Sequence, residues 1–464
     1  MTSTFDLVIL GAGSGGYACA LRAAQLGMSV ALIEQDLVGG TCLHRGCIPT
    51  KAILHAAEVA DSARGAAQFG VHATVQGIDL AAVNRYSASV VARLYKGLTG
   101  LVNGRRITVV HGAGRLERSD SEIVVAVDKA RYRGRHTVLA TGASARSLPG
   151  LGVDGQRVLT SEHALRLERL PSSAIVLGGG VIGVEFASAW RSFGVEVSVV
   201  EALPRLVSGE EPEISQGLQR AFRKRSIPVL TGRPMKSVDV TGPGVRMTLA
   251  DDTVLEADLV LVAVGRGPNT NGLGYAEAGL AMEGGFVAVN ERLETSLPGV
   301  RAVGDIVAGP QLAHRGFAHG IFVAEDIAAA ENQTTMPAPV LDDQIPKVTY
   351  SDPEIASVGL GEDAARARYG DVTTLTYDLA GNGRSQILKT HGFVKLVRRT
   401  GGPVVGVHMI GARVSELVAE AQLITTWDAH PSDVAGLLHA HPTQGEALGE
   451  AHLALAGKPL HSHG

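Results

Sequence analysis

Residues 39–51 read Gly-Gly-Thr-Cys-Leu-His-Arg-Gly-Cys-Ile-Pro-Thr-Lys and hold two of the three cysteines in the chain. Between Cys42 and Cys47, a regular helix would advance about 7.5 Å and turn through about 500°. A disulfide requires Cα atoms within about 4.4–6.8 Å. The spacing therefore predicts that Cys42 lies before a helix or in a distorted first turn, with Gly46 giving slack. Cys47 is then expected near a helix N-terminus, which favours a thiolate.

The two cysteines are best interpreted as a redox-active disulfide lying against a flavin. A disulfide held away from its relaxed geometry is easily reduced, which suits a bond that opens in every turnover. Zinc bound by Cys42, Cys47 and His44 or His55 is an alternative, but a structural zinc site usually has two closely spaced ligand pairs. Two unrelated buried thiols are a further alternative. Lys51 is expected to share the helix face of Cys47.

Composition limits the class of protein. The chain has 464 residues, is 45% hydrophobic and only 4% aromatic, and contains 58 glycines, as expected of several α/β domains. Its formal net charge of −4 gives no general attraction to nucleic acid or to anionic lipid. No apolar run reaches the roughly 20 residues that span a bilayer. With no basic leader pattern at its start, the chain is expected to be cytoplasmic and to have no nucleic-acid or membrane partner.

A dinucleotide-binding pattern opens the chain. An apolar run at 5–10 leads into a glycine turn and a helical pattern, and a second apolar run closes on Glu34. Gly11 permits the tight turn, Gly13 lets the backbone approach a pyrophosphate, and Gly16 permits close helix packing. Glu34 is expected to hydrogen-bond ribose hydroxyls. An ordinary βα turn is the alternative.

The same pattern recurs at Gly178, Gly180 and Gly183, followed by a strand that ends at Glu201. The first glycine and the acidic residue are 23 positions apart in both copies. Two nucleotide sites are therefore predicted. An acidic residue at 201 favours the free 2′-hydroxyl of NAD over the 2′-phosphate of NADP, although Arg205 weakens this preference slightly.

Acidic residues near the ends of predicted strands are further candidates. Glu185 is expected in the first turn of the second fingerprint helix, where it either offsets the helix dipole or pairs with Lys51 where nicotinamide meets flavin. Asp305 ends a strand and either holds a sugar hydroxyl or caps a helix. Strand-like runs also end at Thr141-Gly142 and at Gly265.

The C-terminal part, beyond about 340, changes to a mixed α+β pattern that suggests a separate domain. Its last predicted helix, at 443–456, follows His439-Ala440-His441-Pro442. Thr443 and Glu446 have the spacing of a capping box. His441 could take a proton from an incoming thiol near neutral pH. Glu446 could cap the helix with one oxygen and hold His441 with the other.

Taken together, these motifs resemble the flavin-dependent disulfide reductases, class I of the pyridine nucleotide-disulfide oxidoreductases, and most closely those that oxidise dihydrolipoamide. The resemblance covers essentially the whole chain, and its most specific motifs are Gly40-Thr41-Cys42 to Lys51 and His441-Pro442-Thr443 with Glu446. It implies two Rossmann-like dinucleotide-binding domains and a C-terminal α+β dimerisation domain. The implied boundaries are 1–148 for FAD, 149–268 for NAD, 269–340 for a central domain that completes the FAD site, and 341–464 for dimerisation.

The resemblance also implies residue roles. The implied catalytic residues are Cys42, Cys47, His441 and Glu446, with the last two serving the disulfide of the opposite subunit of a homodimer. Cys42 is the implied thiol for exchange with substrate, and Cys47 the one that contacts the flavin. The implied cofactor-binding residues are Gly11, Gly13, Gly16, Glu34, Lys51, Gly114, Thr141, Gly142, Gly178, Gly180, Gly183, Glu185, Glu201, Gly265, Asp305 and Ala313.

The implied reaction is oxidation of protein-bound dihydrolipoyl groups by NAD⁺, through the disulfide and FAD, with lipoyl domains of 2-oxoacid dehydrogenase complexes as partners. A sibling NAD(P)H-dependent reductase of another small disulfide is the alternative, and a binding role without chemistry is disfavoured because both cysteines, Lys51 and His441 are retained. No metal is expected. One departure is His44-Arg45, where many relatives carry Asn-Val. An inward-pointing Arg45 guanidinium would favour thiolates at the two cysteines, whereas an outward-pointing one would only lie at the rim of the site.

Overall fold

The computed structural model describes residues 2–119 and 122–461. The chain divides into two compact units. The segments of the first unit are Met1–Ile53, Ala81–Arg146 and Arg266–Asp342, and those of the second are Leu54–Leu80, Ser147–Gly265 and Asp343–Gly464. The four predicted domains stay a prediction.

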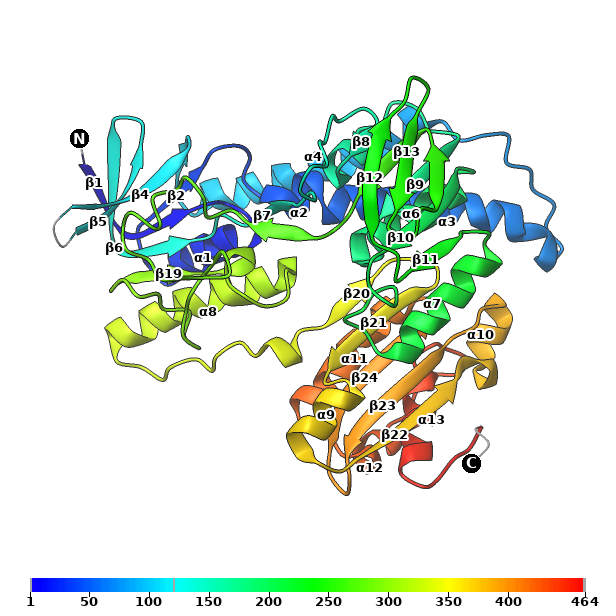
Figure 1. The fold of residues 1–464 in the computed structure, drawn as a ribbon. Helices are drawn as coiled ribbons and strands as arrows, with labels where there is room; N and C mark the ends of the chain where they lie inside the picture. Colours follow the sequence, from blue (N-terminus) through cyan, green and yellow to red (C-terminus); the bar gives the residue numbers. More distant parts are fainter. Residues whose placement is uncertain (1, 120–121, 462–464) are drawn as a thin grey trace. The chain divides into compact units, whose positions relative to one another are not determined.

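The first unit is built on a seven-stranded sheet with the order β3-β2-β1-β6-β5-β4 and with β19 paired to β6 (Figure 1). The strands are β1 (Thr2–Leu10), β2 (Val30–Glu34), β3 (Thr108–His111), β4 (Gly114–Ser119), β5 (Glu122–Val127), β6 (Ala130–Leu139) and β19 (Val300–Ala302). β1 is parallel to β2 and β6, and Leu10 is in register with Ile33 and with Leu139. The carboxyl ends of these three strands therefore share one edge, where α/β sheets bind nucleotides.

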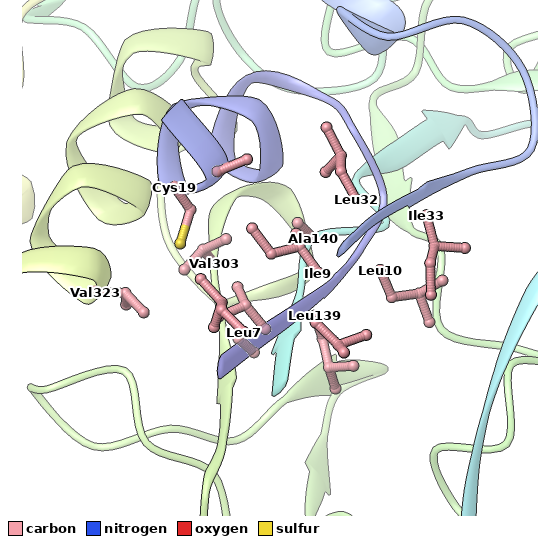
Figure 2. Close-up of a cluster of buried hydrophobic side chains, with 14 of the residues drawn as sticks. Leu7, Ile9, Leu10, Cys19, Leu32, Ile33, Leu139, Ala140, Val303 and Val323 are labelled. Atoms are coloured by element: carbon pink, nitrogen blue, oxygen red, sulfur yellow. The ribbon is translucent and has the colours of Figure 1, made fainter. Parts of the chain in front are cut away.

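The core of this unit lies on the central strands. The apolar runs of β1, β2 and β6 are almost continuous, as expected for parallel strands covered on both faces. Figure 2 shows Leu7, Ile9, Leu32 and Leu139 in this cluster, together with Cys19. Cys19, the third cysteine of the chain, is fully buried and packs as a small apolar side chain.

Helix α1 (Ser14–Gln25) begins directly after the first glycine turn, as predicted. The unit also contains α2 (Gly40–Arg45), α4 (Leu80–Gly104), α8 (Ala313–Asn332) and a 3-10 turn at Gly304–Ile306. Helix α3 (Cys47–Gly65) begins in this unit and continues into the second, which also holds a 3-10 turn at Ala66–Phe69, and a further 3-10 turn at Asp342–Gln344 lies at the boundary of the two units. Helices α1 and α8 touch through glycine. A Cβ at Gly320 would come within 2.2 Å of the Gly15 carbonyl oxygen, so any side chain there would separate the helices.

Small two-stranded sheets complete the first unit. They pair β7 (Ala143–Ala145) with β16 (Arg266–Pro268), and β17 (Met282–Glu283) with β18 (Phe286–Val287).

The second unit contains the repeated nucleotide-binding pattern as a parallel sheet with the order β11-β10-β9-β15-β8. Its strands are β8 (Val158–Leu159), β9 (Ser173–Leu177), β10 (Glu196–Glu201), β11 (Val229–Thr231) and β15 (Leu259–Val262). Three antiparallel strands follow one another in a separate sheet: β12 (Met235–Val240), β13 (Val245–Leu249) and β14 (Val254–Ala257). The helices of this part are α5 (Ser161–Ala164), α6 (Val181–Ser192) and α7 (Pro212–Lys224).

The C-terminal part of the second unit is an antiparallel sheet with helices, which confirms the predicted α+β pattern. The strand order is β20-β21-β24-β23-β22, and the strands are β20 (Lys347–Thr349), β21 (Glu354–Gly359), β22 (Val372–Asp378), β23 (Phe393–Arg399) and β24 (Val404–Gly411). The helices are α9 (Glu362–Tyr369), α10 (Gly383–Leu388), α11 (Val414–Thr426), α12 (Pro431–Ala435) and α13 (Glu446–Leu455), with a 3-10 turn at Leu379–Gly381.

Three elements of this part are not evident from the sequence pattern. Strand β21 follows directly on Pro353, a residue that obscures a strand pattern. Helices α10 and α12 have six and five residues, too few to show a helical period. In the part of the chain that the structure describes, no helix is long and apolar enough to cross a membrane.

Candidate active site

The first glycine turn has the geometry of a pyrophosphate cradle. Gly11 has φ of +101°, and a Cβ at Gly16 would lie 1.8 Å from the Gly11 carbonyl oxygen. Nothing lies within 4 Å of the position that a Cβ would take at Gly13, which is the N-cap residue of α1. The first turn of α1 contains no acidic residue and its cap makes no side-chain hydrogen bond. The N–H groups at this helix end therefore suit an anionic diphosphate.

Glu34 lies at the end of β2 beside this turn. Its carboxylate accepts hydrogen bonds from the N–H groups of Ala12, at 2.7 Å, and Asp36, at 2.9 Å. Burial raises the pKa of Glu34, against hydrogen bonds and the nearby Arg45 guanidinium. Each oxygen retains a second lone pair, so the same carboxylate can still accept from a ribose hydroxyl.

The cysteine segment lies directly on the glycine turn. The Gly39 N–H donates to the Ala12 carbonyl at 2.8 Å, and a Cβ at Gly40 would come within 2.6 Å of Gly13 Cα. Gly39 and Gly40 both have positive φ, which lets the chain reverse at this close approach. The predicted disulfide segment and the predicted pyrophosphate site are thus parts of one structure.

The two cysteines occupy two different helices. Cys42 lies in the short helix α2. Gly46, with φ of −143° and ψ of −109°, ends that helix, and Cys47 is the first residue of α3. This confirms the predicted placement of Cys42 before the main helix and of Cys47 at its N-terminus. The Thr50 N–H and hydroxyl both donate to the Gly46 carbonyl, and so fix the first turn of α3.

Both cysteines are partly buried. The pKa of Cys42 is raised, chiefly by its hydrogen bond to Cys47 and then by burial, while the charge of Lys51 acts in the opposite direction. The two sulfurs are therefore neighbours, with Lys51 close enough to stabilise a thiolate. Burial, and then the two cysteines, raise the pKa of Tyr17 to about 12. The disulfide itself stays a prediction.

His44 and Arg45 turn toward the loop that precedes α2. His44 Nε2 is 3.0 Å from the Val38 carbonyl oxygen, and its ring meets Tyr95 edge-on at 5.1 Å. Arg45 forms an ion pair with Asp36. These contacts favour the rim position for the guanidinium, beside the carboxyl end of β2.

The remaining predicted residues of the first unit lie at the same sheet edge or next to it. The Thr141 hydroxyl donates to the Asn269 carbonyl at 2.7 Å and lies 3.0 Å from Tyr275 Oη, and Gly142 has φ of +71°. Gly114 lies in β4, and a Cβ there would come within 2.5 Å of the Leu10 side chain. Ala313 is the first residue of α8.

Asp305 lies in the 3-10 turn that precedes α8. It therefore does not cap that helix, whose N-cap residue is Leu312. Burial raises the pKa of Asp305, while Arg266 and Arg315 oppose the rise. A partly buried carboxyl among two guanidinium groups is suited to hold a sugar hydroxyl.

Arg315 and His319, both on α8, were missed from the sequence. Arg315 is 3% exposed, and it donates to Asp342 at 2.6 Å and to the Ala308 carbonyl at 2.6 Å. The Gly304 N–H donates to His319 Nδ1 at 3.3 Å, and burial lowers the pKa of His319 to about 4. The sequence signal that could have identified them is an arginine and a histidine four residues apart near the start of a helix that follows Asp305.

The second glycine turn repeats the geometry of the first. Gly178 has φ of +114°, a Cβ at Gly183 would lie 1.9 Å from the Gly178 carbonyl oxygen, and Gly180 is again open. The Glu201 carboxylate accepts from the N–H groups of Gly179, at 2.6 Å, and Leu203, at 2.7 Å. Gly180 is the N-cap residue of α6, and the first turn of that helix contains no acidic residue. A second anionic diphosphate fits here as well as at the first turn.

Arg205 and Gly265 both follow this second turn in the sequence. The Arg205 guanidinium donates to the Ser208 carbonyl at 2.9 Å. Gly265, with φ of +108°, follows the strand that pairs with β9.

Glu185 corrects one expectation. It lies in the second turn of α6, beyond the reach of simple dipole compensation at the helix end. It is 2% exposed and accepts a hydrogen bond from the Tyr350 N–H at 2.9 Å. Its predicted pairing with Lys51 joins residues of different compact units and stays a prediction.

His441 and Glu446 form a close pair. His441 Nδ1 lies 2.7 Å from Glu446 Oε1, and Glu446 Oε2 accepts from the Thr443 N–H at 2.8 Å. Burial tends to raise the pKa of Glu446, but the hydrogen bonds from His441 and Thr443 prevail and lower it. One carboxylate therefore serves both the helix end and the histidine, as predicted, and His441 Nε2 points away from the carboxylate.

The capping box itself is only half formed. The N-cap residue of α13 is Gly445 and Glu446 is the first helical residue. The Thr443 hydroxyl donates to the Ala440 carbonyl at 2.7 Å instead of accepting from the helix. The predicted start of this helix at 443 is therefore three residues too early.

The predicted site residues fall into two groups. The first unit holds Gly11, Gly13, Gly16, Glu34, Cys42, Cys47, Lys51, Gly114, Thr141, Gly142, Asp305 and Ala313. The second unit holds Gly178, Gly180, Gly183, Glu185, Glu201, Gly265, His441 and Glu446. Among the described residues, no group of three or more His, Cys, Asp and Glu side chains is arranged to hold a metal ion.

Comparison with known proteins covers nearly the whole chain. Residues 5–320 match the family described as pyridine nucleotide-disulphide oxidoreductase, and residues 345–452 match its dimerisation domain. A dihydrolipoyl dehydrogenase of Bacillus subtilis is 38% identical over 99% of this chain and 100% of its own length. A leghemoglobin reductase of Glycine max is 36% identical over 99% of this chain and 88% of its own. The crystal structure of LpdA from Mycobacterium tuberculosis superposes with a TM-score of 0.89 at 27% identity, covering 97% of this chain and 99% of that one.

Proposed function

The chain belongs to the pyridine nucleotide-disulphide oxidoreductase family, and from this premise we propose that it oxidises protein-bound dihydrolipoyl groups with NAD⁺. It is an enzyme, and the cofactors of its family are FAD and NAD. The observation that carries the proposal is the close approach of Gly40 to Gly13, which joins the cysteine helix α2 to the first glycine turn.

The chemistry assigned to the cysteines follows from their surroundings. In the proposed reaction, His441 takes a proton from one substrate thiol, and the thiolate attacks Cys42 Sγ in a Cys42–Cys47 disulfide. That disulfide breaks, a mixed disulfide forms, and Cys47 leaves as a thiolate stabilised by Lys51 and the start of α3. The second substrate thiol then displaces Cys42 and closes the lipoamide ring, so two electrons and two protons leave the substrate. The chemistry that bound FAD supplies is two-electron transfer between the cysteine pair and NAD⁺.

The proposed cofactor positions rest on the two glycine turns. The first turn with Glu34, Thr141 and Asp305 is assigned to FAD, and the second turn with Glu201 is assigned to NAD. The contact of Arg205 with the Ser208 carbonyl supports NAD over NADP, because a guanidinium bound to its own loop leaves Glu201 as the nearby charge.

The proposed assembly is a homodimer, supported by the match to the family's dimerisation domain. We assign the base for each cysteine pair to the partner subunit's His441, because a side chain that is 75% exposed is available to a second chain. The proposed partners are lipoyl domains of 2-oxoacid dehydrogenase complexes, and the proposed location is the cytoplasm.

The experiment that tests the function is steady-state reduction of NAD⁺, and separately of NADP⁺, by dihydrolipoamide with the purified FAD-loaded protein. Fast turnover with NAD⁺ alone is expected. A yellow protein whose flavin is reduced by dithiothreitol but which ignores dihydrolipoamide would refute the substrate while leaving disulfide chemistry in place. Such an outcome would point to another substrate, since a relative that is 36% identical is named leghemoglobin reductase.

A further inference from the structure

The segment that carries His441 is held from both sides. Residues 439–445 form neither helix nor strand, so side-chain contacts must set their position. Downstream of His441, Asn382 donates to the Thr443 carbonyl at 3.0 Å and Gln444 donates to the Ala412 carbonyl at 2.8 Å. These contacts come from the N-cap residue of α10 and from the segment before α11, and they fix the entry into α13.

A second histidine–carboxylate pair lies upstream of His441. His439 Nε2 is 2.8 Å from Glu420 Oε1, and Glu420 lies on α11. The side chain of His439 is 15% exposed, whereas that of His441 is 75% exposed. The two histidines are two residues apart, yet one is anchored in the domain and the other faces outward.

Helix α13 is shaped to receive the His439 ring. A Cβ at Gly449 would come within 2.6 Å of His439 Nδ1, so the ring packs against the helix backbone at a position where only glycine leaves room for it. With Nε2 directed at Glu420 and Nδ1 facing the helix, neither ring nitrogen can reach a substrate thiol. His439 is therefore unsuited to be the base itself.

We propose that His439 and Glu420 are a positioning pair for His441. The pair ties the upstream end of the 439–445 segment to α11 and α13, while Asn382 and Gln444 tie the downstream end. His441 is left as the exposed point between two anchors, with its Nδ1 held by Glu446. This inference rests on the proposed function only in that it takes His441 as the base for the incoming thiol.

The physical reason is the short range of proton transfer. A base must come within about 2.6–3.2 Å of the proton donor, and a misplacement of about 1 Å can slow a reaction about a hundredfold. An irregular segment anchored at one end only would sample many positions of His441. The pair removes that freedom without touching substrate.

The test uses the FAD-loaded protein and dithiothreitol, a dithiol that does not depend on the physiological substrate. We expect His439→Ala to slow flavin reduction by dithiothreitol about tenfold to a hundredfold. NADH oxidation by ferricyanide, which needs no thiol base, should be unchanged. His439→Gln should recover much of the lost rate, because its amide N–H can still donate to Glu420. The matched control is His136→Ala, which removes a partly buried histidine that pairs with Glu331 at 3.2 Å.

The decisive measurement is the effect of His439→Ala in a His441→Gln background. If His439 acts through His441, its removal there should not slow flavin reduction further, since non-additivity is expected of residues that act as a unit. An equal further loss in that background, equal loss of both activities, or an effect no larger than that of His136→Ala would each overturn the inference.

Gly449→Ala provides a second route if His439→Ala fails to assemble with FAD. The added methyl would displace the ring and leave both members of the pair intact, and the same selective loss is expected. An unchanged rate of flavin reduction in this variant would count against the inference. If wild-type protein is reduced by dithiothreitol but not by dihydrolipoamide, only the proposed substrate fails.

Discussion

Replacement of His441 by glutamine should separate catalysis from stability. The side chain is 75% exposed, and its contact to Glu446 Oε1 is an exposed pair of the kind that contributes about 0–1 kcal/mol to folding. A general base, in contrast, contributes about 10²–10⁴ to a rate, which corresponds to about 2.7–5.5 kcal/mol in the activation barrier. The same substitution should therefore affect the barrier several times more than the fold.

The assay compares two activities of the FAD-loaded protein. Oxidation of dihydrolipoamide by NAD⁺ requires proton removal from a thiol, so its rate should fall by about 10²–10⁴. NADH oxidation by ferricyanide bypasses the cysteines and should be retained, and the melting temperature should change by only a few degrees. Equal loss of both activities would refute the reasoning, because it would show damage to the fold or to the cofactor sites.

Glu446→Gln is the matched variant for this prediction. Its amide oxygen can still accept from the Thr443 N–H, so the entry into α13 is retained while the negative charge beside His441 is lost. We expect a selective loss smaller than that of His441→Gln. A larger loss, with ferricyanide activity intact, would move the essential role from the histidine to the carboxylate.

Other predictions concern the remaining site residues. Cys47→Ser should retain FAD but lose the long-wavelength thiolate–flavin band on reduction with dithiothreitol, and survival of the band would remove Cys47 from the flavin-proximal position. Glu201→Ala should raise the Michaelis constant for NAD about tenfold to a hundredfold, the size of a lost charged hydrogen bond, and an unchanged constant would exclude Glu201 from the ribose site. Mixing Cys42→Ser chains with His441→Gln chains should restore about a quarter of wild-type activity if the site is shared between subunits, and no recovery would contradict that sharing. Burial lowers the pKa of His319 from 6.5 to about 4, so the unfolded chain takes up a proton at this residue before the native state does. As the pH falls from about 6.5 to 4, this difference should lower the free energy of unfolding by up to about 3 kcal/mol. The melting temperature of His319→Gln should depend less on pH over this range, and an equal dependence would count against a neutral buried His319.

The sequence determined the local architecture of both nucleotide-binding turns. Glycine is required at positions 11, 16, 178 and 183, because a Cβ there would come within 3 Å of a backbone oxygen or carbon. The spacing of these glycines therefore indicates the strand–turn–helix geometry. The placement of Cys47 at a helix N-terminus, with Cys42 before that helix, was also predictable. Part of this geometry is local, because a Cβ at Gly16 or Gly183 would meet the carbonyl oxygen of the glycine five residues earlier. Gly11 and Gly178 instead pack against Ala140 and Ala263, and those contacts depend on which strands pair.

Short elements and long-range contacts were beyond the sequence. Helices α10 and α12 are too short to show a period, and the start of α13 shifted because Thr443 bonds to the Ala440 carbonyl instead of to the helix. Glu185 was expected near a helix end, but its carboxylate satisfies the Tyr350 N–H, 165 residues further along the chain.

What only the tertiary structure decided is which partner each polar side chain takes. The Arg45 ion pair with Asp36, the Arg315 contacts beside Asp305, and the His439–Glu420 pair all depend on which segments the fold brings together. Residue type and spacing define what a side chain can do, because that is local chemistry. Its partner depends on packing among distant segments, because an ion pair or hydrogen bond forms only where the fold brings donor and acceptor within about 3 Å.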